Sequence, residues 1–129
     1  MKSYVNPVGW FEIPVTDMER AIRFYENVFV IKLARNKMGH LDMAWFPSGE
    51  NAVGSAGSLV YHPDFYKPSH EGSLLYFTTP TGELDKDIEA IENAGGKILV
   101  PKTLINEDIG YMCVFEDSEG NRVAIHSRY

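Results

Sequence analysis

The stretch GWFEIPVTDMERAIRFYENVF, residues 9–29, decides the fold because a strand pattern passes directly into a helix pattern within it. Residues 9–15 alternate as a strand does, and Pro14 places this strand at an edge or near its end. Thr16 and Glu19 have the spacing of a capping box, which predicts a helix start. Apolar residues then recur every three or four positions on one helical face. These residues are Met18, Ala21, Ile22, Tyr25, Val28 and Phe29.

The same order of elements then occurs a second time along the chain. A proline-containing polar segment at 63–72 predicts a loop between the two occurrences. A second helix is expected at 83–94, with Gly95 and Gly96 as its stop. The remaining strands are expected at residues 31–37, 41–46, 57–62, 73–79, 97–100, 111–115 and 122–127. The two halves, about 9–62 and 73–128, thus share the order βαβββ, which indicates an internal repeat.

These elements predict one α+β domain over residues 1–129, because the chain is too short for two independently stable domains. Eight strands that give one face to helices must bury the other face against something. A curved, partly closed eight-stranded sheet satisfies this requirement. Its concave interior would form a cavity lined by every second residue of the inward strands.

Amino-acid composition limits the classes of molecule that this protein is expected to bind. The formal net charge of −6 and the sequence pI near 5.1 argue against nucleic-acid binding, which favours a basic face. No segment is apolar over the length needed to span a membrane, and no secretory signal precedes residue 10, so we expect a cytoplasmic protein. Cys113, the single cysteine, is expected to be a small core residue.

Three segments carry a resemblance to a known family. EIPVTDMERAIRFYENVF at 12–29, AGGKILVPKT at 94–103 and FEDSEGNRVAIHS at 115–127 resemble the vicinal oxygen chelate superfamily. This superfamily includes glyoxalase I, bleomycin-resistance proteins and extradiol dioxygenases. The resemblance implies paired βαβββ modules and a homodimer.

The resemblance also implies where a metal would bind. Counted from the matching motifs, the three ligand positions of metal-dependent members fall on Trp10, on Leu74 or Tyr76, and on Ala124. Trp, Leu and Ala offer no lone pair for a divalent cation, and a phenol is a poor ligand at neutral pH. We therefore predict no metal and no cofactor. Displaced ligands such as Glu12, Tyr76 and His126 leave a divalent metal as an alternative.

Two titratable residues are the candidate catalytic groups. If Trp10 faces the cavity, strand alternation places Glu12 there too, while Phe11 and Ile13 face the helices. Alternation likewise places His126 on the same side as Ala124. Glu12 and His126 across an apolar cavity could act as acid and base, although each also has a purely structural interpretation.

The candidate ligand-binding residues are mostly aromatic, because flat rings suit a ring-bearing ligand. They are Trp10, Trp45, Tyr76, Tyr111 and Ala124. The leading hypothesis is a glyoxalase-like protein that binds a small, partly aromatic or amphipathic molecule without the usual metal. The alternatives are a metal-dependent lyase, isomerase or dioxygenase of the superfamily, and a drug-sequestering protein of the bleomycin-resistance type.

Overall fold

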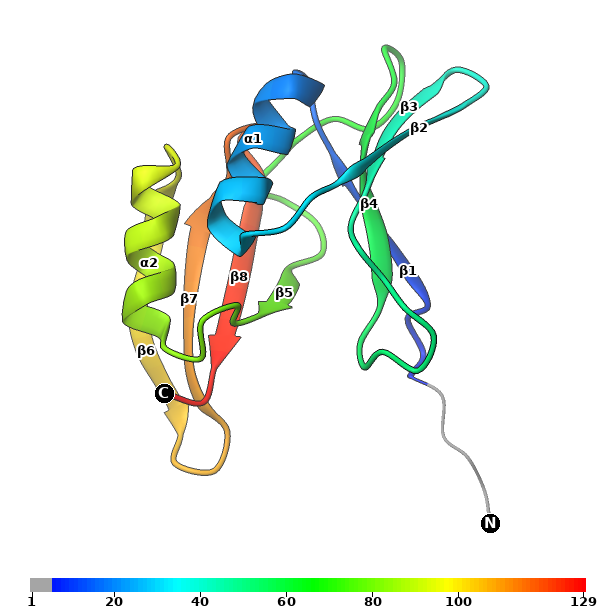
Figure 1. Ribbon diagram of the computed structural model, residues 1–129. Coiled ribbons are helices and arrows are strands. Elements are labelled where there is room, and N and C mark those ends of the chain that lie inside the picture. The colour runs from blue at the N-terminus through cyan, green and yellow to red at the C-terminus, as the bar shows by residue number, and fades with distance from the viewer. Residues whose placement is uncertain (1–5) are drawn as a thin grey trace.

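The computed structural model describes residues 6–129 as two helices and eight strands (Figure 1). The first half consists of β1 (Trp10–Pro14), α1 (Met18–Phe29), β2 (Ala34–Met38), β3 (Leu41–Trp45) and β4 (Ala56–Tyr61). The second half consists of β5 (Leu75–Thr78), α2 (Leu84–Asn93), β6 (Lys97–Asn106), β7 (Gly110–Glu116) and β8 (Arg122–Ser127). The predicted α+β class and the order of elements are confirmed. No helix in this described range is long and apolar enough to cross a membrane.

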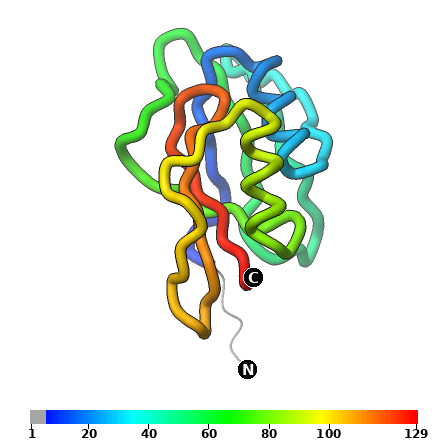
Figure 2. Tube along the Cα trace, turned by 90° about the vertical axis from the view of Figure 1, so that its left-hand side faces the viewer, coloured from blue at the N-terminus to red at the C-terminus, as the bar shows by residue number. Residues whose placement is uncertain are grey.

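The strands form two four-stranded sheets with the same topology, ordered β1-β4-β3-β2 and β5-β8-β7-β6. In each half the first strand pairs in parallel with the last, and the other pairs are antiparallel. The eight predicted strands are thus divided between two sheets that diverge from each other and do not close into a barrel (Figure 1). Figure 2 shows the β6–β7 hairpin extending beyond the rest of the second half.

One apolar core joins the two halves. It includes Ile13 and Leu59 from the first sheet, Phe115 and Ile125 from the second, and buried residues of both helices. The ring of Phe24 in α1 lies with its centroid 6.2 Å from that of Phe115 in β7. Cys113 belongs to this core as predicted, and burial raises the pKa of its thiol to about 11.

The start of α1 differs from the predicted capping box. Asp17, not Thr16, is the N-cap, and its carboxylate accepts a hydrogen bond from the Arg20 backbone N–H. Thr16 instead donates both its backbone N–H and its hydroxyl to the carboxylate of Glu119. A distant carboxylate has taken the place of Glu19, which spacing alone could not reveal.

Strand β6 is also longer than predicted. The sequence pattern stops it at Val100 because Pro101 follows, but it runs to Asn106 with register shifts between Ile98 and Val100, between Val100 and Thr103, and again after Leu104. Proline is tolerated here because β6 is an edge strand and its pairing with β7 is irregular around Pro101. No ladder hydrogen bond therefore requires the backbone N–H that proline lacks.

Candidate functional site

The side chains of β1 divide between two faces of the first sheet, as strand alternation predicts. Ile13 is buried in the shared core and Phe11 packs against it, whereas Trp10 and Glu12 are exposed on the opposite face. The β1–β4 ladder pairs Glu12 with Ser58, and the β3–β4 ladder pairs Trp45 with Ser58. Trp10, Glu12, Ser58 and Trp45 therefore share one face of the sheet.

The two tryptophans of the chain come together on this face. Trp10 and Trp45 pack edge to face, with their ring centroids 5.4 Å apart and an interplanar angle of 75°. They come from different strands, so the contact depends on β4 lying between β1 and β3. The result is a continuous aromatic surface on the side of the sheet away from the core.

Glu12 lies at the edge of this aromatic surface and accepts two hydrogen bonds. Trp10 Nε1 donates to one carboxylate oxygen at 3.2 Å, and Tyr66 Oη donates to the other at 2.6 Å. The hydrogen bond to Glu12 raises the pKa of Tyr66, which keeps the phenol protonated as a donor. Glu12 is exposed, so the apolar enclosure expected for it is absent. Tyr66 comes from the loop between the halves and was not among the predicted site residues.

Two polar atoms on the same face lack partners. Within residues 6–129, Trp45 Nε1 and Ser58 Oγ are buried side-chain atoms without a hydrogen bond. A buried donor without a partner costs roughly 1–3 kcal/mol, so such groups accompany sites that a ligand or water completes. We call Trp10, Glu12, Trp45, Ser58 and Tyr66 the tryptophan face.

The second sheet holds most of the other predicted site residues. Tyr76 pairs with Ala124, which places both on one face, and Met112 pairs with His126 on that same face. His126 Nε2 lies 2.7 Å from the carbonyl oxygen of Ile109. The structure therefore joins His126 to the β6–β7 hairpin, and it does not join His126 to Glu12.

Tyr111 lies elsewhere than expected. It pairs with Ser127, one position out of phase with Ala124 and His126, so alternation turns it to the helix-covered face of the sheet. There it packs against the core, and Lys102 Nζ lies 4.5 Å from its ring centroid. Tyr111 and Ala124 therefore lie on opposite faces of the second sheet, which the sequence could not show because the strand register was unknown.

The positions that the family implies for a metal do not fit one. They hold an indole at Trp10, either the aliphatic side chain of Leu74 or the phenol of Tyr76, and a methyl group at Ala124, and only the phenol has an oxygen to offer. Glu12, the nearest carboxylate in the sequence, is already bonded to Trp10 and Tyr66. Across residues 6–129, no three His, Cys, Asp or Glu side chains are grouped as a metal site requires.

Comparison with known proteins agrees with this fold. Residues 8–125 match the model of the Glyoxalase/Bleomycin resistance protein/Dioxygenase superfamily. The chain belongs to this superfamily. A glyoxylase-like domain-containing protein of Didymella fabae is 28% identical over 124 residues, which cover 94% of this chain and 93% of the relative.

Solved structures of other superfamily members have the same architecture. A glyoxylase/bleomycin resistance protein/dioxygenase domain from Frankia sp. EAN1pec aligns with a TM-score of 0.72 and 18% identity. The alignment covers 96% of the present chain and 98% of the Frankia domain. Glyoxalase I from Zea mays aligns with a TM-score of 0.70 and 20% identity, over 95% of this chain but only 46% of the maize chain. The present chain thus spans about half the length of that enzyme.

Proposed function

We propose that this superfamily member binds a small, partly aromatic or amphipathic molecule on the tryptophan face, without a resident metal. The observation that carries the proposal is the contact of Trp10 with Trp45 beside the carboxylate of Glu12. The indole rings would stack on a planar group of the ligand, and Glu12 would accept a hydrogen bond or attract a cationic group.

The unpartnered polar atoms support the same assignment. Trp45 Nε1 can donate and Ser58 Oγ can both donate and accept, so a ligand that parts the two indoles would find both kinds of partner. Tyr66 holds Glu12 in place from the opposite side of the carboxylate. A few polar groups set among aromatic side chains are typical of small-molecule sites.

The two tryptophans make the test direct, because both lie on the proposed site and the described chain holds no others. A library of ring-bearing neutral and cationic molecules would be screened by thermal shift, and each hit titrated by tryptophan fluorescence. We expect Glu12→Gln to fold normally and to bind a hit about tenfold more weakly, equivalent to about 1.4 kcal/mol.

Glu92→Gln is the matched control, because Glu92 is an exposed carboxylate on α2, far from the first sheet. It should bind as the unmodified protein does. Equal affinity of Glu12→Gln and Glu92→Gln for every hit would remove Glu12 from the site.

Two further measurements separate the proposal from its alternatives. Elemental analysis of protein purified without chelator should give no stoichiometric zinc, nickel, manganese or iron, and a full equivalent would favour a metal-dependent member. Mass spectrometry after prolonged incubation with a hit would reveal any conversion. A ligand recovered unchanged favours a binding protein, such as one that sequesters a drug.

A further inference from the structure

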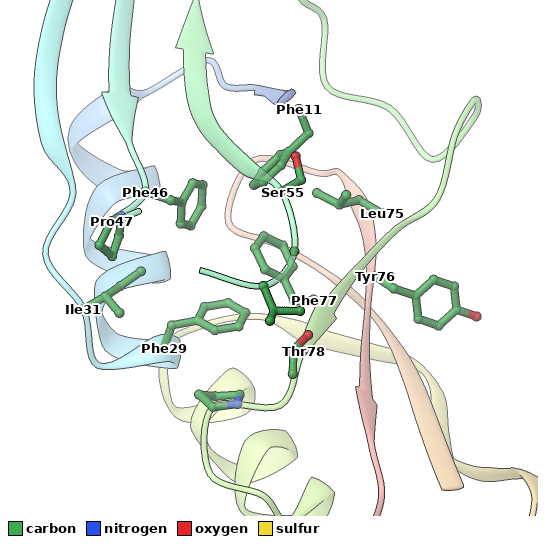
Figure 3. A pocket seen from close by; sticks show the side chains of 13 residues that line it. Phe11, Phe29, Ile31, Phe46, Pro47, Ser55, Leu75, Tyr76, Phe77 and Thr78 are labelled. Atoms are coloured by element: carbon green, nitrogen blue, oxygen red, sulfur yellow. The ribbon is translucent and has the colours of Figure 1, made fainter. Parts of the chain in front are cut away.

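A second candidate site lies on the other side of β1, where the two sheets diverge (Figure 3). It is a cavity of about 450 Å³, a size within the range of roughly 300–1,000 Å³ that small-molecule sites occupy. Both halves contribute to it, chiefly through Phe11, Phe29, Ile31, Phe46, Leu75 and Phe77. We call it the phenylalanine cavity.

Four phenylalanine rings form its wall. The ring of Phe77 is central, with its centroid 4.6 Å from that of Phe29, 5.6 Å from Phe46 and 5.8 Å from Phe11. All four residues are only partly buried, whereas Tyr25 behind them is fully buried. The rings therefore present open faces to the cavity and do not fill it themselves.

A glycine permits this arrangement. Gly57 lies opposite Phe11 in the β1–β4 ladder, and a β-carbon at residue 57 would collide with the Phe11 ring. Because position 57 has no side chain, the Phe11 ring can lie across β4 and leave the cavity open.

The chemistry of the lining restricts the ligand. None of the 13 lining residues is charged. Figure 3 shows the Tyr76 ring directed away from the other labelled side chains, so the hydroxyls of Ser55 and Thr78 are the polar side-chain groups nearest to the rings. Val53, at the rim, is fully exposed, and a bound molecule would cover its apolar surface.

We infer that the phenylalanine cavity binds a neutral, largely apolar, ring-bearing molecule, at a site separate from the tryptophan face. The two sites lie on opposite faces of the first sheet, because Phe11 and Glu12 are neighbours on one strand. The lining offers no charged group to compensate the desolvation of an ion, whereas an aromatic ring would replace solvent against four apolar faces.

The test uses N-phenylnaphthylamine, a neutral two-ring-system dye whose fluorescence rises in apolar surroundings. We expect saturable binding to the intact protein in the micromolar range. Phe77→Leu, which removes the central ring but keeps an apolar side chain, should weaken binding about tenfold. Val53→Glu should do the same by placing a charge at the rim, and it should fold normally because Val53 contacts solvent alone.

Two controls locate the dye. Val30→Glu makes the same change at another exposed valine that does not line the cavity, and it should bind as the unmodified protein does. Trp10→Phe alters the tryptophan face and should also leave dye affinity unchanged.

Three results would overturn the inference. The first is the absence of saturable dye binding, and the second is equal dye affinity in Val53→Glu and Val30→Glu. The third is a loss of dye binding in Trp10→Phe alone, which would assign the dye to the tryptophan face. Sedimentation of each variant provides a fourth criterion. If Val53→Glu changes the oligomeric state of the protein and the unmodified protein does not bind the dye, the cavity is a contact between copies of the chain.

Discussion

At the scale of single residues, the Glu119 carboxylate accepts six hydrogen bonds within residues 6–129. The donors to this buried group include the backbone N–H groups of Thr16 and Asp17 and the guanidinium of Arg20 at 2.7 Å. Burial opposes ionisation of Glu119, but these hydrogen bonds outweigh it and lower the pKa to about 2. One side chain from the β7–β8 turn thereby fixes the start of α1.

This pKa predicts how stability depends on pH. A carboxylate whose pKa falls from 4.5 to about 2 on folding stabilises the folded state above pH 4.5, by about 3 kcal/mol. That contribution is lost as the pH falls from 4.5 toward 2. We expect Glu119→Gln to unfold at lower urea concentration than the unmodified protein at pH 7, with the difference shrinking at pH 3.

The pKa of Asp117, the buried neighbour of Glu119, is shifted in the opposite direction. Burial raises the pKa of Asp117, against hydrogen bonds donated by Tyr25 Oη at 2.6 Å and by Asn121. Because Asp117 is present in both proteins, the difference between Glu119→Gln and the unmodified protein isolates Glu119. A difference that stays constant between pH 7 and pH 3 would contradict the assigned pKa.

The candidate site was predictable only where it depends on local geometry. Strand alternation placed Trp10 and Glu12 on one face and Phe11 on the other, because a period of two needs no knowledge of partners. The contact of Tyr66 with Glu12 depends on a loop folding back across 54 positions, and no local pattern reports that. The face that Tyr111 occupies was hidden for the same reason, since its orientation follows from strand register.

At the scale of elements, the turn of the β6–β7 hairpin leads into Gly110, the first residue of β7, where the fold requires glycine. Gly110 has φ +107°, and a β-carbon there would lie 2.5 Å from the carbonyl oxygen of Ser127 and 2.8 Å from the Arg128 Cα. The close approach allows β7 and β8 to pair up to Tyr111 and Ser127. The positive φ and the lack of room for a β-carbon therefore both select glycine at position 110.

Comparison of two glycines separates these effects. Gly72 has a similar φ of +96°, but a β-carbon there would meet nothing within 4 Å. Gly110→Ala and Gly72→Ala should share the strain of positive φ, and Gly110→Ala should cost about 1–3 kcal/mol more because of the backbone collision. Chemical denaturation measures both variants. Equal losses would mean that the β7–β8 end relaxes freely.

Most element types followed from sequence periodicity, and the errors lie at element boundaries. The helices were predicted to within one or two residues because their apolar faces repeat over three turns. Strand β6 was cut short at Val100 because the pattern around Pro101 does not reveal an edge strand with shifted pairing. The division into two sheets also lay beyond the pattern, since alternation does not specify which strands are neighbours.

At the scale of the whole molecule, the two halves share one core. Phe46 of the first half packs against Phe77 of the second, and Tyr25 donates to Asp117. The loop between the halves is bonded to each of them, through Tyr66 to Glu12 and through the Ser69 backbone N–H to Asn121. Neither half can separate without exposing this shared interior.

The two halves should therefore unfold in one transition. Both tryptophans are in the first half, and Cys113, with a pKa raised to about 11 by burial, is in the second. Tryptophan fluorescence and the reactivity of the Cys113 thiol toward a disulfide reagent should give the same midpoint in urea. Two separate midpoints would show that the halves are independent units.

The parallel pairing of first with last strands has a consequence for synthesis of the protein. β1 leaves the ribosome early, but its neighbour β4 follows only after α1, β2 and β3. Until then Phe11 and Ile13 have no ladder to hold them, and β5 waits in the same way for β8. Each nascent half thus carries an uncovered apolar strand that is vulnerable to aggregation during translation. A chaperone that shields this strand would therefore raise the yield of folded protein.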